Sequence, residues 1–476
     1  VGNKNADGET VYDELAPGWT DQNYRSCYYT YDITDYLFSG TNTLAVGVNH
    51  GWKSVSSERS NDPSTPFKLL AQMVITYTDG TSDTVVTDGS WSTAHVGPVM
   101  LGELYQGEYY DATADFSFRE NGFVDSTWQK AKTVTFNTKL AARDGGAIYV
   151  RKDLERAPQT VTVYDGATDS SDTQYGKINV TATYGDEGFT LKAGQTAVVD
   201  FGQNFAGWEN ITLSGEKGTI LRIRHAEMLN DKMGLISRGN DGPEGSVYTA
   251  SLRSAPASTH YVLSGEGEEN YRPTTTYYGF RYIELTATKD ITVLVLRGEV
   301  ATSVTEDMGS FKTSDEDINR LYQNVIWGQY SNYFGQATDC PQRDERLGYS
   351  GDAQVFVGTA VYNSQVKAFL RNFMQTLVEG QADDGAYGST LPLKISSGNT
   401  WAGVAGWADA GIIVPYTYYK QYGDPSILAE YYDSMAKYMD YLNSMDKRIG
   451  LRFGDWLSYA ANDAQMYEYI SYVYTI

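Results

Sequence analysis

The hydrophobic pattern of the chain changes near residue 309, and this change constrains the fold more than any other feature. Before it, apolar residues occur in short runs interrupted by Gly, Asp and Asn, a pattern typical of β-strands joined by turns. After it, apolar residues recur every three or four positions, as on one face of a helix. The order of these patterns predicts β-domains followed by an all-helical region.

The β-like part extends to about residue 300 and contains several strand signals. The clearest runs are residues 73–77, 84–86, 211–213, 220–223, 282–285 and 291–296. An Asp79-Gly80 pair between the first two runs predicts a hairpin. Short strands with frequent turns favour β-sandwiches. A polar, turn-rich segment near residues 155–175 separates two of them, so we predict β-sandwich domains over residues 1–160 and 161–304.

The helical part, residues 305–476, opens with Ser314-Asp315-Glu316-Asp317, which predicts a capping box at the start of a helix. Three apolar stripes with helical spacing follow, and their expected role is core packing. They comprise Ile318, Leu321, Tyr322 and Val325; Val366, Phe369, Leu370, Phe373 and Leu377; and Leu428, Tyr431, Tyr432, Met435, Tyr438, Met439 and Leu442.

Charge and composition narrow the classes of partner. The 476 residues include 60 acidic and 37 basic side chains, for a net charge of −23. Such a surface repels nucleic acid and anionic membranes but not a neutral sugar. The 39 Tyr and 9 Trp residues permit stacking on sugars, although β-sandwiches are rich in these residues in any case.

Cysteine and histidine usage points away from disulfides and metal centres. Cys27 and Cys340 fall in different predicted domains, so we expect two free thiols. The four His residues are scattered, without the spacing of a His/Cys metal site. No apolar run approaches the ~18 residues of a membrane span.

Residues 338–354 read TDCPQRDERLGYSGDAQ and form the densest charged segment. Four carboxylates and two Arg residues fall within fourteen positions, in a loop that leads into a helix starting near Asp352. Like charges held close and partly away from water raise one carboxyl pKa. A carboxylic acid that stays protonated near neutral pH can donate its proton to a leaving glycosidic oxygen. Arg343 and Arg346 would hold the remaining carboxylates ionised.

A surface salt-bridge loop that caps a helix is the structural alternative for this segment. Trp401, Trp407 and Trp456 lie next to Gly or Asp in the same helical region, and loop aromatics beside carboxylates suit a sugar pocket. Spacing alone does not separate the two interpretations.

The segment from Asp339 to Phe356 resembles the hallmark segment of bacterial α-L-rhamnosidases, glycoside hydrolase family 78. Other parts of the chain support the resemblance. Residues 15–21 and 29–34 resemble the N-terminal β-sandwich of the family, and residues 200–208, 224–227 and 278–282 resemble its second β-domain. The resemblance covers essentially the whole chain.

This resemblance implies an (α/α)6 barrel for the helical part and hydrolysis of terminal α-L-rhamnose with inversion, on glycosides or polysaccharides. It makes Glu345 the general acid. The rhamnose-binding residues that it implies are Asp339, Arg343, Tyr349, Asp352, Trp407 and Trp456. Tyr349 stands where the family often has Trp, which keeps a stacking face and adds a hydroxyl. Trp401 is the rival of Trp407 for the second pocket Trp.

An inverting enzyme also needs a carboxylate that activates water, ~6.5–9.5 Å from the acid. The resemblance places that base far downstream, and no Glu in this chain has its context. Residues 309–476 leave room for roughly half of the barrel helices, at ~11–12 residues for a mean helix plus loops. We therefore expect a chain truncated at both ends, without the general base. Its compartment, bacterial cytoplasmic or secreted, is not evident from the sequence.

Two other functions are kept as alternatives: a rhamnose-binding fragment without activity, and another inverting exo-glycosidase on the same barrel. No cofactor is implied. A structural calcium ion is the one exception, because some related N-terminal domains bind sugar with calcium. Asp111 would serve there, although an ordinary turn acid is the favoured interpretation. We expect His225 to be a structural strand residue.

Overall fold

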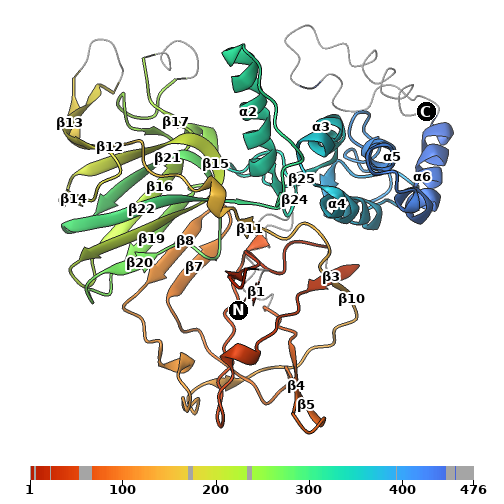
Figure 1. Ribbon diagram of the computed structural model, residues 1–476, viewed down its shortest axis with the longest axis horizontal. Coiled ribbons are helices and arrows are strands. Elements are labelled where there is room, and N and C mark those ends of the chain that lie inside the picture. Colours follow the sequence, from red (N-terminus) through yellow and green to blue (C-terminus); the bar gives the residue numbers. More distant parts are fainter. Residues whose placement is uncertain are drawn as a thin grey trace.

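The computed structural model describes residues 2–4, 7–21, 23–52, 67–169, 175–232, 239–392, 394–445 and 456. A β-rich part ends at Thr302, and helices follow from Glu316 (Figure 1). The predicted order of β-domains and helical region is confirmed. Among the described residues, no helix combines the length and the apolar character needed to cross a bilayer.

A sheet of twelve strands dominates the β-rich part. Its main path runs β11 (Tyr149–Val150), β22 (Ile291–Thr302), β15 (Thr196–Gly215), β21 (Tyr278–Ala287), β16 (Ile220–Ala226), β19 (Ser258–Val262), β8 (Gly107–Asp111) and β7 (Val99–Glu103). Four strands pair off this path: β12 (Thr160–Thr168), β13 (Lys177–Tyr184), β14 (Phe189–Leu191) and β20 (Glu269–Tyr271). Strand β15 is long because its first half, to Gly207, pairs with β21 and its second half, from Gly207, pairs with β22; a register shift between Asp200 and Phe205 interrupts the first pairing.

Strands from the predicted N-terminal domain join this sheet. The orange strands β7 and β8 continue the green strands in Figure 1, and β8 pairs in parallel with β19, Gly107 opposite Ser258. Strand β11 pairs with β22. The domain limits at residues 160 and 304 stay a prediction, but hydrogen bonds clearly connect the first two regions.

The remaining strands form small pairs. These are β1 (Asn3–Lys4) with β2 (Thr10–Val11), β3 (Arg25–Tyr28) with β10 (Lys139–Ala142), β4 (Gln72–Thr76) with β5 (Ser82–Val86), β6 (Ser92–Thr93) with β9 (Gln129–Lys130), β17 (Met228–Leu229) with β18 (Val247–Tyr248), β23 (Tyr333–Phe334) with β24 (Gln336–Ala337), and β25 (Gly348–Tyr349) with β26 (Thr390–Leu391). The β4–β5 pair confirms the predicted hairpin, since Gln72 faces Val86 and Gly80 adopts a positive φ of 86° in the turn.

The helices are α2 (Glu316–Asn332), α3 (Ser350–Asn363), α4 (Lys367–Glu379), α5 (Ala410–Tyr422) and α6 (Ser426–Ser444). Asp315 caps α2 by accepting hydrogen bonds from the backbone N–H groups of Asp317 and Ile318. The predicted capping box was therefore one residue off, because Asp315 and not Ser314 occupies the N-cap.

The apolar stripes differ in how they pack. The stripe of α4 is buried as predicted, from Val366 to Leu377. The stripe of α6 buries Tyr431, Tyr438 and Leu442 but leaves Tyr432 exposed. In α2 the prediction was wrong for Ile318 and Leu321, which are exposed, whereas Tyr322 packs partly buried against the helical core. The buried residues of this helix lie near its C-terminal end and include Ile326 and Tyr330, so its first turns remain open to solvent.

Three of the hydrophobic cores in the described part of the chain are large. One lies within the large sheet and includes Phe201, Phe205 and Phe280, and a second lies among the helices. A third core joins the two parts, with Trp208 and Tyr277 from the sheet and Phe334 from the segment that follows α2. The rings of Tyr277 and Phe334 stack with centroids 3.9 Å apart. Both cysteines are buried free thiols, as predicted.

A buried ion pair ties the N-terminal region to the helices. Arg25 of β3 donates from Nε to Glu379 at the end of α4, over 2.7 Å, and its side chain is 2% exposed. Its other donors approach Thr376 Oγ1 and the Cys27 sulfur.

We expect Arg25→Met to lower the free energy of unfolding by about 2–3 kcal/mol, because the largely buried Glu379 carboxylate loses its partner. The double variant Arg25→Met/Glu379→Met should recover much of this loss. Lys152→Met is the control, since its ion pair with Glu9 is exposed and should contribute about 0–1 kcal/mol. Urea denaturation measures all four proteins. Equal stability of Arg25→Met and wild type would contradict the assignment.

Candidate active site

The acid loop, residues 338–349, lies between β24 and α3. It is fixed by one buried side chain, Arg346, which is fully enclosed. Its guanidinium donates to the backbone carbonyls of Leu104 and Tyr277 over 2.6 and 2.8 Å, and to those of Gln342 and Arg343 within the loop. The expectation that Arg346 would hold carboxylates ionised was wrong. Its planar fork of donors instead satisfies carbonyls that the curved loop leaves without partners.

The β-rich part supports the acid loop at further points. Tyr105 donates its hydroxyl to the Glu345 carbonyl over 2.6 Å. Pro341 packs on Gly279 of β21 so closely that a Cβ at Gly279 would lie 2.5 Å from the proline Cγ. Only glycine fits that position, and the loop therefore sits directly on the sheet.

Within the loop, the structure brings Asp339, Arg343 and Glu345 together. Arg343 Nε and Nη2 each lie 2.6 Å from Glu345 Oε2, and Nη2 lies 3.5 Å from Asp339 Oδ2. The Asp339 and Glu345 side chains also hydrogen-bond to each other. Two carboxyl groups in this arrangement share one proton, because both cannot ionise at contact distance without repulsion.

The surroundings decide where that proton resides. Burial, followed by the hydrogen bond with Glu345, raises the pKa of Asp339 to about 8. Burial also acts to raise the pKa of Glu345, but the hydrogen bonds from Asp339 and Arg343 outweigh it and lower that pKa to about 2. The free site thus holds its proton on the Asp339 side, whereas the sequence predicted a raised pKa without assigning it to either group.

The other predicted residues of this segment lie around the pair. Tyr349 forms β25, and burial together with the charges of Asp339 and Glu345 raises its pKa. Asp352 lies in the first turn of α3, where partial desolvation and the charge of Glu345 raise its pKa. The pKa values of Tyr349 and Asp352 therefore both depend on the charge of Glu345, so both side chains lie near that carboxylate.

The tryptophans differ in their position. Trp407 packs against the start of α3, since a Cβ at Gly351 would lie 2.6 Å from its Nε1. Trp401 packs instead on a small cluster that contains Ala382 and Ile395. Trp407 is therefore the better placed of the two rivals. Trp456 is 59% exposed, and its sequence neighbours lie outside the described residues.

Sequence reasoning missed three site residues from the β-rich part. Arg253 lies 3.1 Å from Glu345 Oε1, and Tyr105 binds the loop backbone as described above. Glu227 accepts a hydrogen bond from Asn204 and lies close enough to Gln342 and Arg343 to interact with both; burial raises its pKa. Glu227 lies in the segment 224–227, which resembles the second β-domain of the family. That resemblance indicated a fold and did not identify Glu227 as a site residue.

Asp339, Cys340 and Glu345 are the described residues that could geometrically surround a cation, since their ligand atoms lie within 4.8 Å of one another. Two guanidinium groups already contact these carboxylates, and their positive charge opposes a metal ion. We therefore interpret the cluster as a proton-sharing pair.

His225 and Asp111, which lie outside the acid loop, have the contacts expected from the sequence. His225 is buried between the Ala257 carbonyl and the Glu209 carboxylate, at 2.8 and 2.7 Å, and stacks on Tyr278. These contacts within the fold are what a structural strand residue would make. Asp111 accepts hydrogen bonds from the backbone and hydroxyl of Thr113, which is the geometry of a turn acid.

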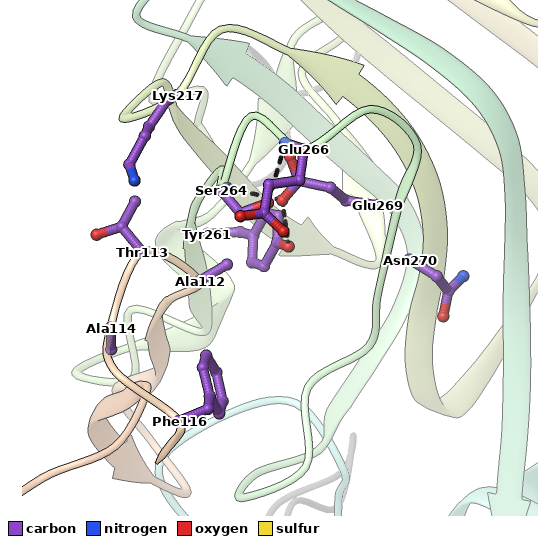
Figure 2. A pocket seen from close by; sticks show the side chains of 10 residues that line it. All are labelled: Ala112, Thr113, Ala114, Phe116, Lys217, Tyr261, Ser264, Glu266, Glu269 and Asn270. Atoms are coloured by element: carbon purple, nitrogen blue, oxygen red, sulfur yellow. Dashed lines mark hydrogen bonds between the residues drawn. The ribbon is translucent and has the colours of Figure 1, made fainter.

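A cavity of about 350 Å³ lies elsewhere, between the segment after β8 and the β19–β20 connection (Figure 2). Phe116, Lys217 and Glu266 line it, and no predicted site residue does. Glu269, at its wall, is satisfied by Tyr261 and by two backbone N–H groups. The cavity is thus separate from the acid loop.

Three family models match successive parts of the chain. The N-terminal domain of α-L-rhamnosidase matches residues 4–152, and the concanavalin-like domain of bacterial α-L-rhamnosidase matches residues 190–302. The 6 hairpin glycosidase domain of bacterial α-L-rhamnosidase matches residues 306–476. The models thus cover the β-rich part and the helical part in the observed order.

Curated and solved relatives agree. An α-L-rhamnosidase of Streptomyces avermitilis is 36% identical over 94% of this chain and 40% of its own length, and one of Formosa agariphila is 33% identical over 94% and 45%. The crystal structure of the S. avermitilis enzyme complexed with L-rhamnose superposes with a TM-score of 0.75 at 30% identity, over 98% of this chain and 42% of that one. This chain spans less than half the length of the curated relatives. The domains, their order and their structure show that it belongs to the bacterial α-L-rhamnosidases.

Proposed function

We propose that this chain carries the general acid and the sugar-binding carboxylates of an inverting α-L-rhamnosidase. Its substrates would be glycosides or polysaccharides with terminal non-reducing α-L-rhamnose. The observation that supports this most strongly is the close cluster of Asp339, Arg343 and Glu345 on a loop that Arg346 anchors to the sheet. A group that keeps a proton near neutral pH can protonate a leaving oxygen.

Glu345 is the donor in this proposal, because it is the more accessible member of the pair: its side chain is 26% exposed, against 10% for Asp339. The proton that rests on Asp339 passes along the hydrogen bond to Glu345 and then to the glycosidic oxygen. The bond between that oxygen and the anomeric carbon breaks as water attacks from the opposite face.

Asp339 also has a binding role. Its Oδ1 is buried and has no hydrogen-bond partner within the described part of the chain. Such an atom is costly to leave unpaired, and a sugar hydroxyl would satisfy it. Arg343 and Asp352 supply a donor and an acceptor nearby, while Tyr349, Trp407 and Trp456 supply stacking faces for the sugar ring.

The general base is not assigned to the acid loop. Asp339 contacts Glu345 directly, so no water fits between them, whereas an inverting pair stands ~6.5–9.5 Å apart. The base must come from another part of the protein. Helix α5 packs on α3, α4 and α6, and α4 also contacts α6, so alternate helices lie beside each other as they would in part of an (α/α)6 barrel.

The first test separates this function from its alternatives. The full-length protein, with its general base present, should hydrolyse an aryl α-L-rhamnoside in preference to other aryl glycosides. Preference for another deoxysugar or a glucuronide would indicate a different exo-glycosidase. Binding of rhamnose without turnover would indicate a binding protein.

We predict that Glu345→Gln lowers turnover of a rhamnosyl disaccharide by about two to four orders of magnitude, because the amide cannot donate the proton. An aryl rhamnoside with an activated leaving group should lose less. Glu266→Gln, an exposed change at the remote cavity, is the control. Near-normal disaccharide turnover by Glu345→Gln would rule out this residue as the acid.

We predict that Asp339→Ala and Asp352→Asn each weaken rhamnose binding by roughly 1–3 kcal/mol, because the first removes the oxygen that would accept from a sugar hydroxyl and the second removes a charged acceptor. Calorimetric titration measures the effect, and Asp383→Asn, exposed on the same helical part, is the control. Unchanged affinity in both variants would assign them to structural roles.

The shared proton also predicts a pH dependence. Since the pKa of Asp339 is raised to about 8, the pair keeps its proton below that pH and loses it above. Disaccharide turnover should therefore fall as pH rises through about 8. In Asp339→Asn the pair no longer stores a proton, and the alkaline limb of kcat/KM should move to lower pH. An unmoved limb would contradict proton sharing.

A further inference from the structure

Arg253 reaches the acid from the β-rich part of the molecule. It follows the short helix η5 (Ala250–Leu252), and its Nη1 lies 3.1 Å from Glu345 Oε1 and 4.0 Å from Asp344 Oδ1. Arg343 contacts the other oxygen, Oε2. One carboxylate oxygen of Glu345 thus contacts a residue of its own loop, and the other contacts a residue from a different region of the chain.

The backbone at Arg253 is unusual for its residue type. Its φ of 58° and ψ of −115° correspond to the first central position of a type II′ turn, which glycine normally occupies. A side chain with a Cβ is strained there. Glycine would relieve the strain, so an arginine at this position indicates that the guanidinium itself has a role.

The next residue strengthens the connection. Ser254 donates from its backbone N–H and its hydroxyl to Asp344 Oδ2, directly before Glu345. The turn at residues 253–254 therefore contacts two consecutive acidic residues of the acid loop, Asp344 and Glu345. The Arg253 side chain remains 51% exposed, so it lies at the mouth of the site.

We propose that Arg253 is a positioning residue: it holds the Glu345 carboxyl in the orientation from which that group protonates the leaving oxygen. The inference rests on the proposed function. It adds that the acid site is not formed by the helical part alone, because it needs a residue of the β-rich part.

Several charged or titratable groups surround Glu345 besides Arg253. They are Asp339, Cys340, Arg343, Asp344, Tyr349 and Asp352, with Glu227 next to Arg343. Arg253 contributes positive charge at the outer edge of this group. Its removal should make the loss of the shared proton harder, which moves the alkaline limb of activity to higher pH. Solvent screening limits this shift to about 0.5–1 pH unit.

The experiment compares Arg253→Gly, Arg253→Lys and wild type as full-length proteins. Glycine suits the backbone, so the variant tests the guanidinium without a folding penalty. Lysine keeps the charge but not the rigid fork. Arg297→Ala is the control, since its partners are Glu155 and Asp186. The measurements are turnover of a rhamnosyl disaccharide and of an activated aryl rhamnoside, the pH profile, and the thermal midpoint.

For Arg253→Gly we expect an unchanged or higher thermal midpoint and a disaccharide turnover about 10- to 100-fold lower, a part of the usual general-acid effect. Activated aryl rhamnoside turnover should fall less than about 3-fold, because it needs little protonation. The alkaline limb of the pH profile should move to higher pH by about 0.5–1 unit. Arg253→Lys should keep the limb near its wild-type pH and lose part of the disaccharide turnover.

Two results would overturn the inference while leaving the proposed function intact. Arg253→Gly with wild-type disaccharide turnover and an unmoved alkaline limb would show that Arg253 has no role in catalysis. Equal losses on both substrates with a lower thermal midpoint would show a structural role. A wild-type protein without rhamnosidase activity would overturn the proposed function, and the inference with it, so the two failures are distinct.

Discussion

The guanidinium of Arg346 lies in the interior between the sheet and the acid loop, where an uncompensated charge would be strongly destabilising. Four backbone carbonyls compensate it, two from the sheet side and two from the loop. Because these contacts join residues up to 242 positions apart, the loop adopts its shape only once both parts have docked. The placement of Asp339, Arg343 and Glu345 depends on that group, with support from the contacts that Tyr105 and Ser254 make to the loop.

Electrostatics at the loop follow from this placement. Asp339 is held in a buried position and Glu345 in a partly open one, so the same pair contains a protonated and an ionised carboxyl. Arginines on both sides favour the ionised form of Glu345. In the proposed mechanism the acid receives its proton from a neighbour, so that proton storage and proton delivery are divided between two residues. This division permits an accessible donor without exposing the stored proton to solvent.

The β-rich part contributes residues to the surroundings of the acid loop. Tyr105, Glu227 and Arg253 come from three separate segments of it, and all three approach the acid loop or its arginine. The parallel pairing of β8 with β19 brings the Tyr105 segment beside the sheet, and the third hydrophobic core fixes the sheet against the helices. Changes in this part can alter acid catalysis without touching the sugar.

Local patterns in the sequence determined the order of β and helical parts, the β4–β5 hairpin, the buried stripe of α4 and the charged loop, because periodicity and turn chemistry act between near neighbours. Tertiary structure decided the rest. The exposure of Leu321 depends on which turns of α2 pack against other elements, and the roles of Arg253 and Arg346 depend on partners that only docking brings within reach. The location of the shared proton likewise follows from the unequal burial of Asp339 and Glu345, and burial is a property of the whole fold.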